Sequence, residues 1–514
     1  MGKFLIFCAG GQGAQEGIQL DVVVEEQHRG KEVLLISCDQ SICFCNDNPN
    51  FDKLRCRICR HFQKKNQKKY LNPNMEHHSI SEFIDDTCPK QSAISFDYND
   101  AISLKKIKYH GVEIGMGAIS TYISFTRNLN PKITNVSKKY FDRILYAQVI
   151  MTHAIENICS RYEIEKVIIH NGRFSIFKPF LNYAQINNIP YTCTEIKLDK
   201  NGLATKDYYE NDIPHNIMPQ QIKYEKYWNE KGKEGYDVLN IGKSFFERRR
   251  NAQGTGDKIY TKDQNPDLDI EGWDNSKENI VIFNSSEDEF CAISEDFEKG
   301  KFFDSQIKGI KKIVEHYLDD NSKHFYLKIH PNLREITYKY HIYLYELSYQ
   351  NLTVIDAKSP ISSYKLLDNC DKVITFGSTM GIEATYAKKP SICLGPAYYD
   401  FLGVVYKPKD ENELWSLINN KNLKHLFNSN IFKYGFYEMG IFDSIIGDKF
   451  KYIDVRMITY HIGNKPRISY AINKICGSKH LFVIFRGMLN LYCKLYKNKN
   501  VKMPLDEDEE LSTR

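Results

Sequence analysis

The sequence predicts an α/β protein made of two doubly wound domains that face each other across a cleft, and three observations indicate this. Short apolar runs of strand length alternate with helical stretches in two regions, residues 1–215 and 280–440. Between them, residues 216–279 lose this alternation and are rich in Lys, Asn, Asp and Gly, which predicts a connector with one short helical stretch at 243–250. A chain of 514 residues, 42% of them hydrophobic, is also too long for one ordinary core and can fill two.

The first region reads as alternating strands and helices from its first residues. Strands are expected at residues 3–8, 32–37, 166–170 and within 187–196, with a glycine-rich turn at 10–13, a helix over 14–28 and another that ends near Arg161. Strands separated by helices of this length form a mostly parallel sheet that is covered on both faces. The first domain is therefore predicted to end near residue 215.

Several polar residues of the first domain are expected at its cleft edge. Gly11 and Gly13 could admit a sugar or a phosphate close to the backbone, and Asn171 and Arg173 follow a strand directly, which suits an anionic acceptor or donor; a surface turn would explain the last two equally well. Glu16 lies just inside the first helix and is the candidate catalytic base for an acceptor hydroxyl. An acid that complements the helix dipole explains Glu16 as well.

Five of the 14 cysteines crowd residues 38–61, which are predicted to form a loop of the first domain. Cys56 and Cys59 form a Cys-x-x-Cys pair, and Cys43 and Cys45 precede them, so the four could close a tetrahedral structural zinc site. Buried or incidental thiols, or a redox role, are the alternatives. Because the chain lacks an export signal, reduced cysteines are expected in any case.

The second region repeats the alternation. Strands are expected at residues 279–283, 324–329, 352–356, 371–376 and 391–394, with helices over 305–318 and 378–387. In an open α/β sheet, ligands bind beyond the carboxyl ends of the strands. The polar residues that follow these strands are therefore the main candidates for a binding site.

The stretch 371–396, "DKVITFGSTMGIEATYAKKPSICLGP", predicts a strand, a helix that begins at Ser378 and Thr379, and a second strand. The first N–H groups of such a helix favour an anion, although Ser378 or Thr379 could simply cap the helix. Glu383 lies one turn beyond Thr379 and does not have capping-box spacing, so it could accept hydrogen bonds from ribose hydroxyls, and Gly381 would let a ligand approach the backbone. The pattern predicts a nucleotide site.

Two further segments end at the same predicted sheet edge. His330 follows its strand directly and Pro331 stops that strand, so the imidazole is expected to contact a phosphate. Ser285 and Ser286 follow the first strand of the domain and are expected near the cleft. Ser286 and Glu289 also have the spacing of a capping box, which is a purely structural explanation.

Together, "HNGRF", "FNSSEDEF", "KIHPN" and "GSTMGIEATYAKKP" resemble motifs of the GT-B glycosyltransferases of bacterial capsule and surface polysaccharide biosynthesis. The last two also resemble motifs of families with cytidine-nucleotide donors: capsular Kdo transferases, sialyltransferases and teichoic-acid glycerophosphotransferases. The resemblance implies two Rossmann-like domains and a nucleotide site that includes His330, Ser378, Thr379 and Glu383. It also implies metal-independent transfer that requires no cofactor, from a nucleotide-sugar donor to a polysaccharide or lipid-linked glycan acceptor. An Asp-x-Asp at 267–269 lies in the connector rather than at a strand end.

Two other functions fit the same motifs. A sugar-nucleotide epimerase with the same two-lobed plan would need no acceptor, and a non-catalytic subunit of a polysaccharide assembly complex would bind without turnover. The near balance of 70 basic and 65 acidic residues gives a formal charge of only +5, so no nucleic-acid partner is expected.

The location is predicted from the two ends of the chain. The first apolar run is too short for a signal peptide and no run is long enough to span a membrane, so a cytoplasmic protein is expected. Residues 441–514 read as a helical segment followed by an acidic tail, and a helix near 477–497 has a broad apolar face and basic residues on one side. This helix is expected to pack on the first domain or to hold the protein peripherally on the inner, anionic face of the cytoplasmic membrane.

Overall fold

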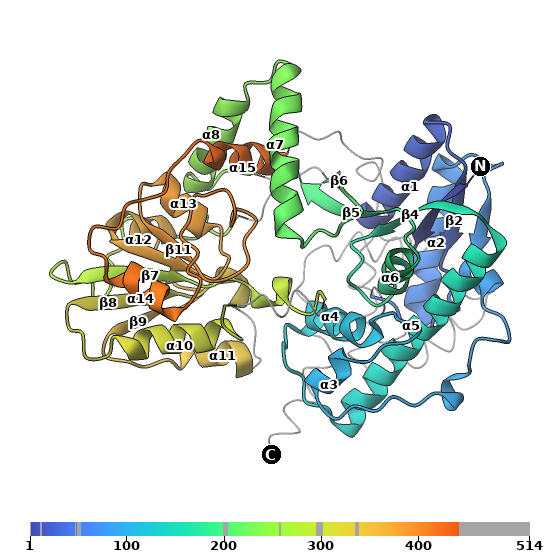
Figure 1. The fold of residues 1–514 in the computed structure, drawn as a ribbon, viewed down its shortest axis with the longest axis horizontal. Coiled ribbons are helices and arrows are strands. Elements are labelled where there is room, and N and C mark those ends of the chain that lie inside the picture. Colours follow the sequence, from blue (N-terminus) through green and yellow to red (C-terminus); the bar gives the residue numbers. More distant parts are fainter. Residues whose placement is uncertain are drawn as a thin grey trace.

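The computed structural model describes residues 2–10, 13–46, 48, 53–198, 204–255, 259–294, 302–334 and 339–440. Gly11 and the predicted tail segment 441–514 lie outside these residues. Figure 1 shows two lobes side by side, each built around one sheet. The predicted α/β class with two doubly wound, Rossmann-like domains is confirmed.

The first lobe contains a six-stranded sheet. Its strand order is β3-β2-β1-β4-β5-β6, with every neighbouring pair parallel except β5 and β6. The strands are β1 (Lys3–Cys8), β2 (Val33–Ser37), β3 (His77–Ser79), β4 (Ile164–His170), β5 (Tyr191–Leu198) and β6 (Ala204–Glu210). Because the chain moves from β1 to β2 on one side and later to β4 on the other, β1 lies at the point where the winding reverses.

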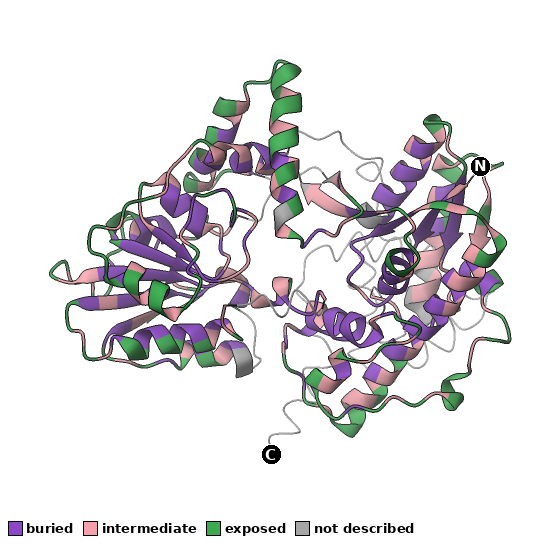
Figure 2. Ribbon diagram, viewed as in Figure 1, coloured by how far each residue is buried: buried purple, intermediate pink, exposed green. Residues whose placement is uncertain are grey.

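Helices cover both faces of this sheet. In β1, Leu5 and Phe7 pack into a core on one face, while Phe4, Ile6 and Cys8 pack on the other, as the alternation of a strand requires. Figure 2 shows that the central strands are buried along most of their length. The helices are α1 (Gly13–His28), α2 (Lys53–Tyr70), α3 (Ala101–Lys105), α4 (Ile114–Thr126), α5 (Asn135–Arg161) and α6 (Lys178–Ile186), with 3-10 turns η1 (Ile80–Phe83) and η2 (Gln91–Ala93).

The second lobe contains a five-stranded parallel sheet with the order β11-β10-β7-β8-β9. Its strands are β7 (Glu278–Phe283), β8 (Lys323–Lys328), β9 (Leu352–Ile355), β10 (Lys372–Thr375) and β11 (Ser391–Cys393). Its helices are α10 (Gln306–His316), α11 (Lys339–Tyr345), α12 (Ser363–Asn369), α13 (Met380–Tyr386) and α14 (Glu411–Asn419), with 3-10 turns η3 (Glu287–Phe290) and η4 (Pro331–Leu333). Here β7 lies at the reversal point, between β8 and β10.

Three helices pack together, α7 (Ile217–Lys233), α8 (Val238–Arg250) and α15 (Asn430–Glu438), and α7 and α15 link them to the first lobe. A Cβ added to Gly435 of α15 would lie 2.3 Å from the carbonyl oxygen of Gly242 in α8, so these two helices pack backbone against backbone. From α15, Tyr437 donates a hydrogen bond to Asp207 of β6. The predicted connector thus contains two helices in its first part, and Figure 1 shows α7 standing between the lobes.

The chain after β7 crosses to the first lobe, and we call residues 287–293 the crossing segment. Asp288 of this segment forms an ion pair with Arg127, at the end of α4. Lys178 of α6 donates a hydrogen bond to the carbonyl oxygen of Ile293 at 2.8 Å. Cys291 and Ala292 belong to the hydrophobic core of the first lobe, so the two lobes share part of one core. Within the described ranges, no helix has both the length and the hydropathy that crossing a membrane requires.

Candidate functional site

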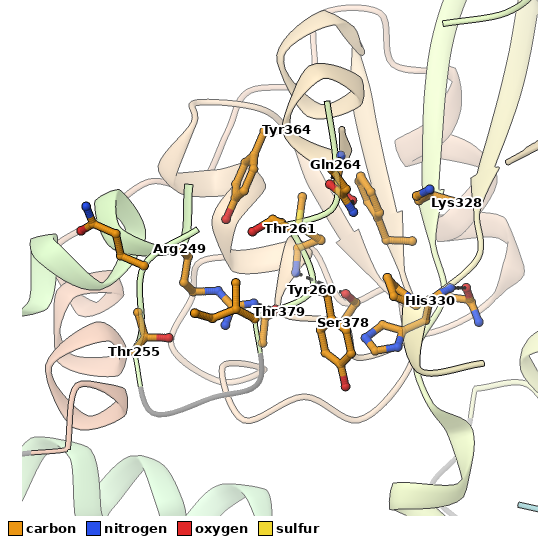
Figure 3. A pocket seen from close by; sticks show the side chains of 17 residues that line it. Arg249, Thr255, Tyr260, Thr261, Gln264, Lys328, His330, Tyr364, Ser378 and Thr379 are labelled. Atoms are coloured by element: carbon orange, nitrogen blue, oxygen red, sulfur yellow. Dashed lines mark hydrogen bonds between the residues drawn. The ribbon is translucent and has the colours of Figure 1, made fainter. Parts of the chain in front are cut away.

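A pocket opens beyond the carboxyl ends of the strands of the second sheet, at its reversal point (Figure 3). Its walls come from the ends of β7, β8 and β10, from the start of α12 and from the chain that follows α8. His330, Ser378 and Thr379, three of the predicted donor-binding residues, line it together.

Ser378 and Thr379 are positioned by a sharp turn after β10. Gly377 has a φ of 100°, and a Cβ there would lie 2.3 Å from the carbonyl oxygen of Pro396, so the turn requires glycine. Thr379 makes no side-chain cap of α13, while Ser378 Oγ accepts a hydrogen bond from the backbone N–H of Met380 at 3.3 Å. Capping therefore does not account for the Thr379 hydroxyl.

The Thr379 hydroxyl instead accepts a hydrogen bond from Arg249, the second-last residue of α8, over 2.9 Å. The same guanidinium donates through Nε to Glu383 at 3.0 Å, and Tyr364 donates a hydrogen bond to the other carboxylate oxygen of Glu383. Burial and the neighbouring carboxylate raise the pKa of Tyr364 far above its usual value. Glu383 is 3% exposed and lies beneath the pocket, where it holds Arg249 at the pocket wall.

His330 is fixed at the opposite side of the pocket. Its backbone N–H donates to the side chain of Asn284 at 2.8 Å, and its Nδ1 accepts from the backbone N–H of Asn332 at 3.2 Å. Because Nδ1 accepts, the neutral ring carries its proton on Nε2 and is a hydrogen-bond donor there. The ring also meets Tyr260 edge-on, with centroids 5.1 Å apart.

Lys328, the last residue of β8, forms part of the pocket floor. Its ammonium group donates to the carbonyl oxygens of Asp356 and Ser359, at 3.1 Å each, and the residue is 2% exposed. Burial lowers the pKa of Lys328 to about 8, against the opposing effect of Asp356. With Arg249, it places a second cationic group beside the hydroxyls and the imidazole, so the pocket suits an anion such as a phosphate.

The other donor-binding candidates lie near the pocket but not on its walls. Ser285 Oγ donates to the carbonyl oxygen of Phe376 at 2.8 Å. Ser286 Oγ donates to Asp288 at 2.6 Å and makes no capping box with Glu289. A Cβ on Gly381 would lie 2.4 Å from the hydroxyl of Tyr399, so this glycine makes room for a tyrosine in the core.

Three of the first-lobe candidates, Glu16, Asn171 and Arg173, occupy buried positions. Glu16 is fully buried; Asn66 donates to one carboxyl oxygen at 2.7 Å, and the other has no hydrogen-bond partner among the described residues. Burial raises the pKa of Glu16 to about 8. Arg173 donates to the carbonyl oxygen of Glu289 in the crossing segment at 2.8 Å, and Asn171 donates to Glu195. Gly13 begins α1.

The four candidate zinc ligands are spread over two elements. Cys56 and Cys59 lie in α2, which begins at Lys53, so the predicted loop is shorter than expected. Cys43 lies near Arg143, with its Sγ 3.5 Å from the carbonyl oxygen, and Cys45 pairs with Asn48 in a β-bridge. Over the described residues, which include all four thiols, no group of three His, Cys, Asp or Glu side chains is placed to hold a metal ion. The zinc site stays a prediction.

Sequence reasoning did not identify Arg249, Tyr260, Lys328 and Tyr364 as pocket residues. Arg249 belongs to "ERRR" at the end of α8, a run that is typical of a solvated helix end. One signal in the sequence could have identified Lys328, because it is a lysine at the end of a strand whose immediately preceding residues are apolar. A buried lysine is rare unless it has a partner, so its position indicates a polar site.

The two doubly wound lobes with a pocket at the second reversal point define a GT-B type fold. Residues 292–437 match the family described as "Capsule polysaccharide biosynthesis protein", and this segment contains His330, Ser378, Thr379 and Glu383. Over that segment, the predicted resemblance to proteins of capsule polysaccharide biosynthesis is confirmed. No curated protein sequence matches the chain.

Three similar solved structures illustrate the range of matches. The β-Kdo 2,4 transferase KpsC of Thermosulfurimonas dismutans is 14% identical, with coverage of 53% of this chain and 79% of that chain and a TM-score of 0.34. The UDP-GlcNAc 2-epimerase of Methanocaldococcus jannaschii, in complex with UDP-GlcNAc and UDP, is 11% identical, with coverage of 84% and 98% and a TM-score of 0.26. The UDP-GlcNAc 2-epimerase of Neisseria meningitidis is 11% identical, with coverage of 90% and 100% and a TM-score of 0.25.

Proposed function

We propose that the protein is a glycosyltransferase that transfers a sugar from a nucleotide-activated donor to a growing capsular or surface polysaccharide or lipid-linked glycan. One observation carries the proposal. Arg249, His330 and the Ser378–Thr379 pair converge on one pocket at the reversal point of the second sheet, and three of these four residues lie within the segment that matches the capsule biosynthesis family.

The pocket supports a chemical role in departure of the nucleotide. When an acceptor hydroxyl attacks the anomeric carbon of the donor, the bond to the nucleotide phosphate breaks and negative charge develops on the phosphate oxygens. The guanidinium of Arg249 and the Nε2–H of His330 would stabilise that charge. We infer that these protein cations and donors can serve in place of a divalent metal, so transfer is proposed to be metal-independent.

The acceptor side is proposed to lie in the first lobe, with Glu16 as the base for the acceptor hydroxyl. A carboxyl with a pKa near 8 is largely protonated at neutral pH. The fraction of Glu16 that is deprotonated and able to act as a base would therefore rise as the pH approaches 8. The same proposal places the protein in the cytoplasm, peripherally on the inner face of the cytoplasmic membrane. A lipid-linked acceptor or a growing glycan would be available to it there.

The test begins with nucleotide binding. Thermal unfolding is measured with cytidine, uridine, guanosine and thymidine nucleotides, and cytidine nucleotides are expected to stabilise most, as the motif resemblance implies. Equal or larger stabilisation by uridine diphosphate would reject the cytidine assignment. No stabilisation by any of the four would reject the nucleotide site.

Turnover separates transfer from epimerisation. The protein is incubated with the stabilising nucleotide sugar, with and without an oligosaccharide acceptor, and the products are resolved by mass spectrometry and NMR. A transferase extends the acceptor and leaves the donor sugar unchanged when no acceptor is present. An epimerised donor in the acceptor-free reaction would contradict the proposal.

A further inference from the structure

Among the elements that the structure describes, helix α2 carries the largest net charge. Its sequence, KLRCRICRHFQKKNQKKY, contains eight Lys or Arg residues and no Asp or Glu, which exceeds the formal net charge of +5 for the whole protein. Such a concentration in a chain that is otherwise nearly balanced is not explained by solubility.

The helix starts at the cleft edge of the first lobe. Arg60 donates a hydrogen bond to the carbonyl oxygen of Asp39, just after β2, and a Cβ on Gly10, just after β1, would lie 2.6 Å from Cys59 Sγ. These contacts place the first half of α2 beside the carboxyl ends of the strands. The helix then runs back along the sheet toward its other edge, because residues 70–76 lead into the parallel strand β3.

Apart from Arg60, the side chains that fasten the second half of α2 to the lobe are uncharged amides. Gln63 donates to the carbonyl oxygen of Cys8 at 3.4 Å, Gln67 donates to Ser37 Oγ at 2.8 Å, and Asn66 donates to Glu16 at 2.7 Å. Gln63 and Gln67 are buried. The packing of this helix on the lobe therefore does not use the charges of the lysines in its second half, Lys64, Lys65, Lys68 and Lys69.

The outer face of α2 carries Lys64, Lys65, Lys68 and Lys69, all exposed. Across the part of the chain that the structure describes, none of these four lysines has a carboxylate within ion-pair distance, whereas Lys226 and Lys231 of α7 pair with Glu230 and Glu234. Arg57, Arg60, Lys64 and Lys68 follow one another at spacings of three, four and four residues, and so lie about one turn, ~5.4 Å, apart along one side.

We propose that this outer face of α2 binds a linear polyanionic glycan, which is the acceptor of the transfer reaction proposed above. This inference rests on the proposed transferase function. A row of cations that begins at the cleft edge suits an extended polymer with repeated carboxylates, because its reactive end can lie in the cleft while the preceding units follow the helix. A membrane surface is the less suitable occupant, since α2 exposes no large apolar side chain among those described, and interfacial helices pair basic residues with such side chains.

The experiment compares two variants with the same change in charge. The test variant replaces Lys64, Lys65, Lys68 and Lys69 with Gln. The control variant replaces four exposed lysines of α7 and α10 with Gln: Lys226, Lys233, Lys308 and Lys311. Binding to a fluorescently labelled oligogalacturonide is followed by anisotropy over a series of salt concentrations, with labelled dextran as the neutral probe.

The wild-type protein and the control variant are expected to bind oligogalacturonide and not dextran. The test variant should bind about tenfold more weakly, and the slope of log K against log salt concentration should fall by about three, since four fewer cations displace counterions. Unchanged affinity in the test variant, or equal binding of dextran, would overturn the proposal. Binding of wild type to phosphatidylglycerol vesicles without any binding to oligogalacturonide would also overturn it and assign α2 to a membrane.

Nucleotide stabilisation is measured on the same proteins to keep the two proposals apart. The test variant should unfold at the wild-type temperature and keep its shift with the stabilising nucleotide. Retained nucleotide shifts together with unchanged oligogalacturonide binding refute the role of α2 alone. Oligogalacturonide binding that depends on α2, in a wild-type protein that shows no nucleotide shift, supports the polyanion site and refutes the donor site.

Discussion

The two lobes share one plan but present different chemistry at the same place. In each sheet the first strand lies at the reversal point, β1 between β2 and β4, and β7 between β8 and β10. Beyond β7 the chain leaves a pocket with cationic and hydroxyl groups. In the first lobe, Glu16 follows β1 and is buried, and Arg173 follows β4 and donates a hydrogen bond to the crossing segment. The topology selects the edge where a site can form, and the side chains decide what that edge does.

The same contrast appears in the two buried glutamates. Glu383 receives hydrogen bonds from Arg249 and Tyr364, so its charge is compensated where it lies. Glu16 receives one hydrogen bond from Asn66, and burial raises its pKa to about 8. One carboxylate fixes a cation for a ligand, whereas the other is poised to exchange a proton near neutral pH. The predictions below test this division, from the largest expected effect to the smallest.

Replacement of Arg249 by Ala should have the largest effect, because it removes one of the two pocket cations and leaves Glu383 buried without its charged partner. Loss of one partner of a buried pair typically costs about 3–5 kcal/mol of unfolding free energy. Nucleotide binding should be lost as well. Both effects are measurable by chemical denaturation and by thermal shift with nucleotide.

The double variant Arg249→Met with Glu383→Gln separates the two effects. It removes both charges, so most of the stability should return while nucleotide binding stays lost. Recovery of nucleotide binding in the double variant would show that Arg249 only neutralises Glu383. It would also show that the pocket needs no cation at this position.

Replacement of His330 by Ala should lower the transfer rate about a hundredfold and leave the protein folded, because the imidazole is assigned to the departing phosphate. The matched control is His324→Ala at the opposite end of β8, where the imidazole bonds Thr353. Transfer within a few-fold of wild type in both variants would remove His330 from the site. The rates are measured with saturating acceptor.

The variant Glu16→Gln should change how stability depends on pH. A pKa of about 8 in the folded chain, against 4.5 as the ordinary value, means that the folded state keeps its proton longer than the unfolded state. The stabilising contribution is therefore complete below pH 4.5 and is lost as the pH rises toward 8, about 3 kcal/mol by pH 7. Glu16→Gln should flatten this decline in denaturation series between pH 5 and 8. A parallel decline in wild type and variant would contradict it.

The sequence predicted the strands of the second sheet and β1, β2, β4 and β5 of the first, because strand and helix periods are local signals, whereas β3 and β6 were not predicted. The βαβ unit at 371–396, the strand before His330 and the edge where they meet all follow from apolar runs and the residues that stop them. Among the helices that were not predicted, α2 and α7 are largely polar, so few apolar residues mark their buried faces. Local patterns can thus place a pocket on a sheet edge but underestimate the helices around it.

The parts of the site that escaped prediction depend on contacts between distant segments. Arg249 reaches Thr379 across 130 residues, and Asp288 reaches Arg127 across 161 residues. The capping box expected from Ser286 and Glu289 does not form, because Ser286 donates to Asp288 instead. No spacing rule contains this information, since tertiary packing alone brings such partners together.

The smallest predicted effect compares one hydroxyl from each lobe. Thr379 Oγ1 accepts a hydrogen bond from Arg249 in the pocket, whereas Thr121 Oγ1 in α4 accepts one from the backbone N–H of Ser175 at 2.8 Å, inside the first lobe. Valine has nearly the same shape as threonine and cannot accept a hydrogen bond. Thr379→Val should weaken nucleotide binding about fivefold with little change in stability, since one hydrogen bond to a charged group is worth roughly 1 kcal/mol or somewhat more.

Thr121→Val should do the reverse, because Thr121 is fully buried and its loss leaves the N–H of Ser175 without this acceptor. It should lower the unfolding free energy by about 1–3 kcal/mol and leave nucleotide affinity unchanged. Isothermal titration with the stabilising nucleotide and denaturation in urea measure the two quantities on each variant. If Thr379→Val lowers stability as much as Thr121→Val does and leaves affinity intact, the Thr379 hydroxyl only holds the fold together. The two reversal points would then differ less than their side chains indicate.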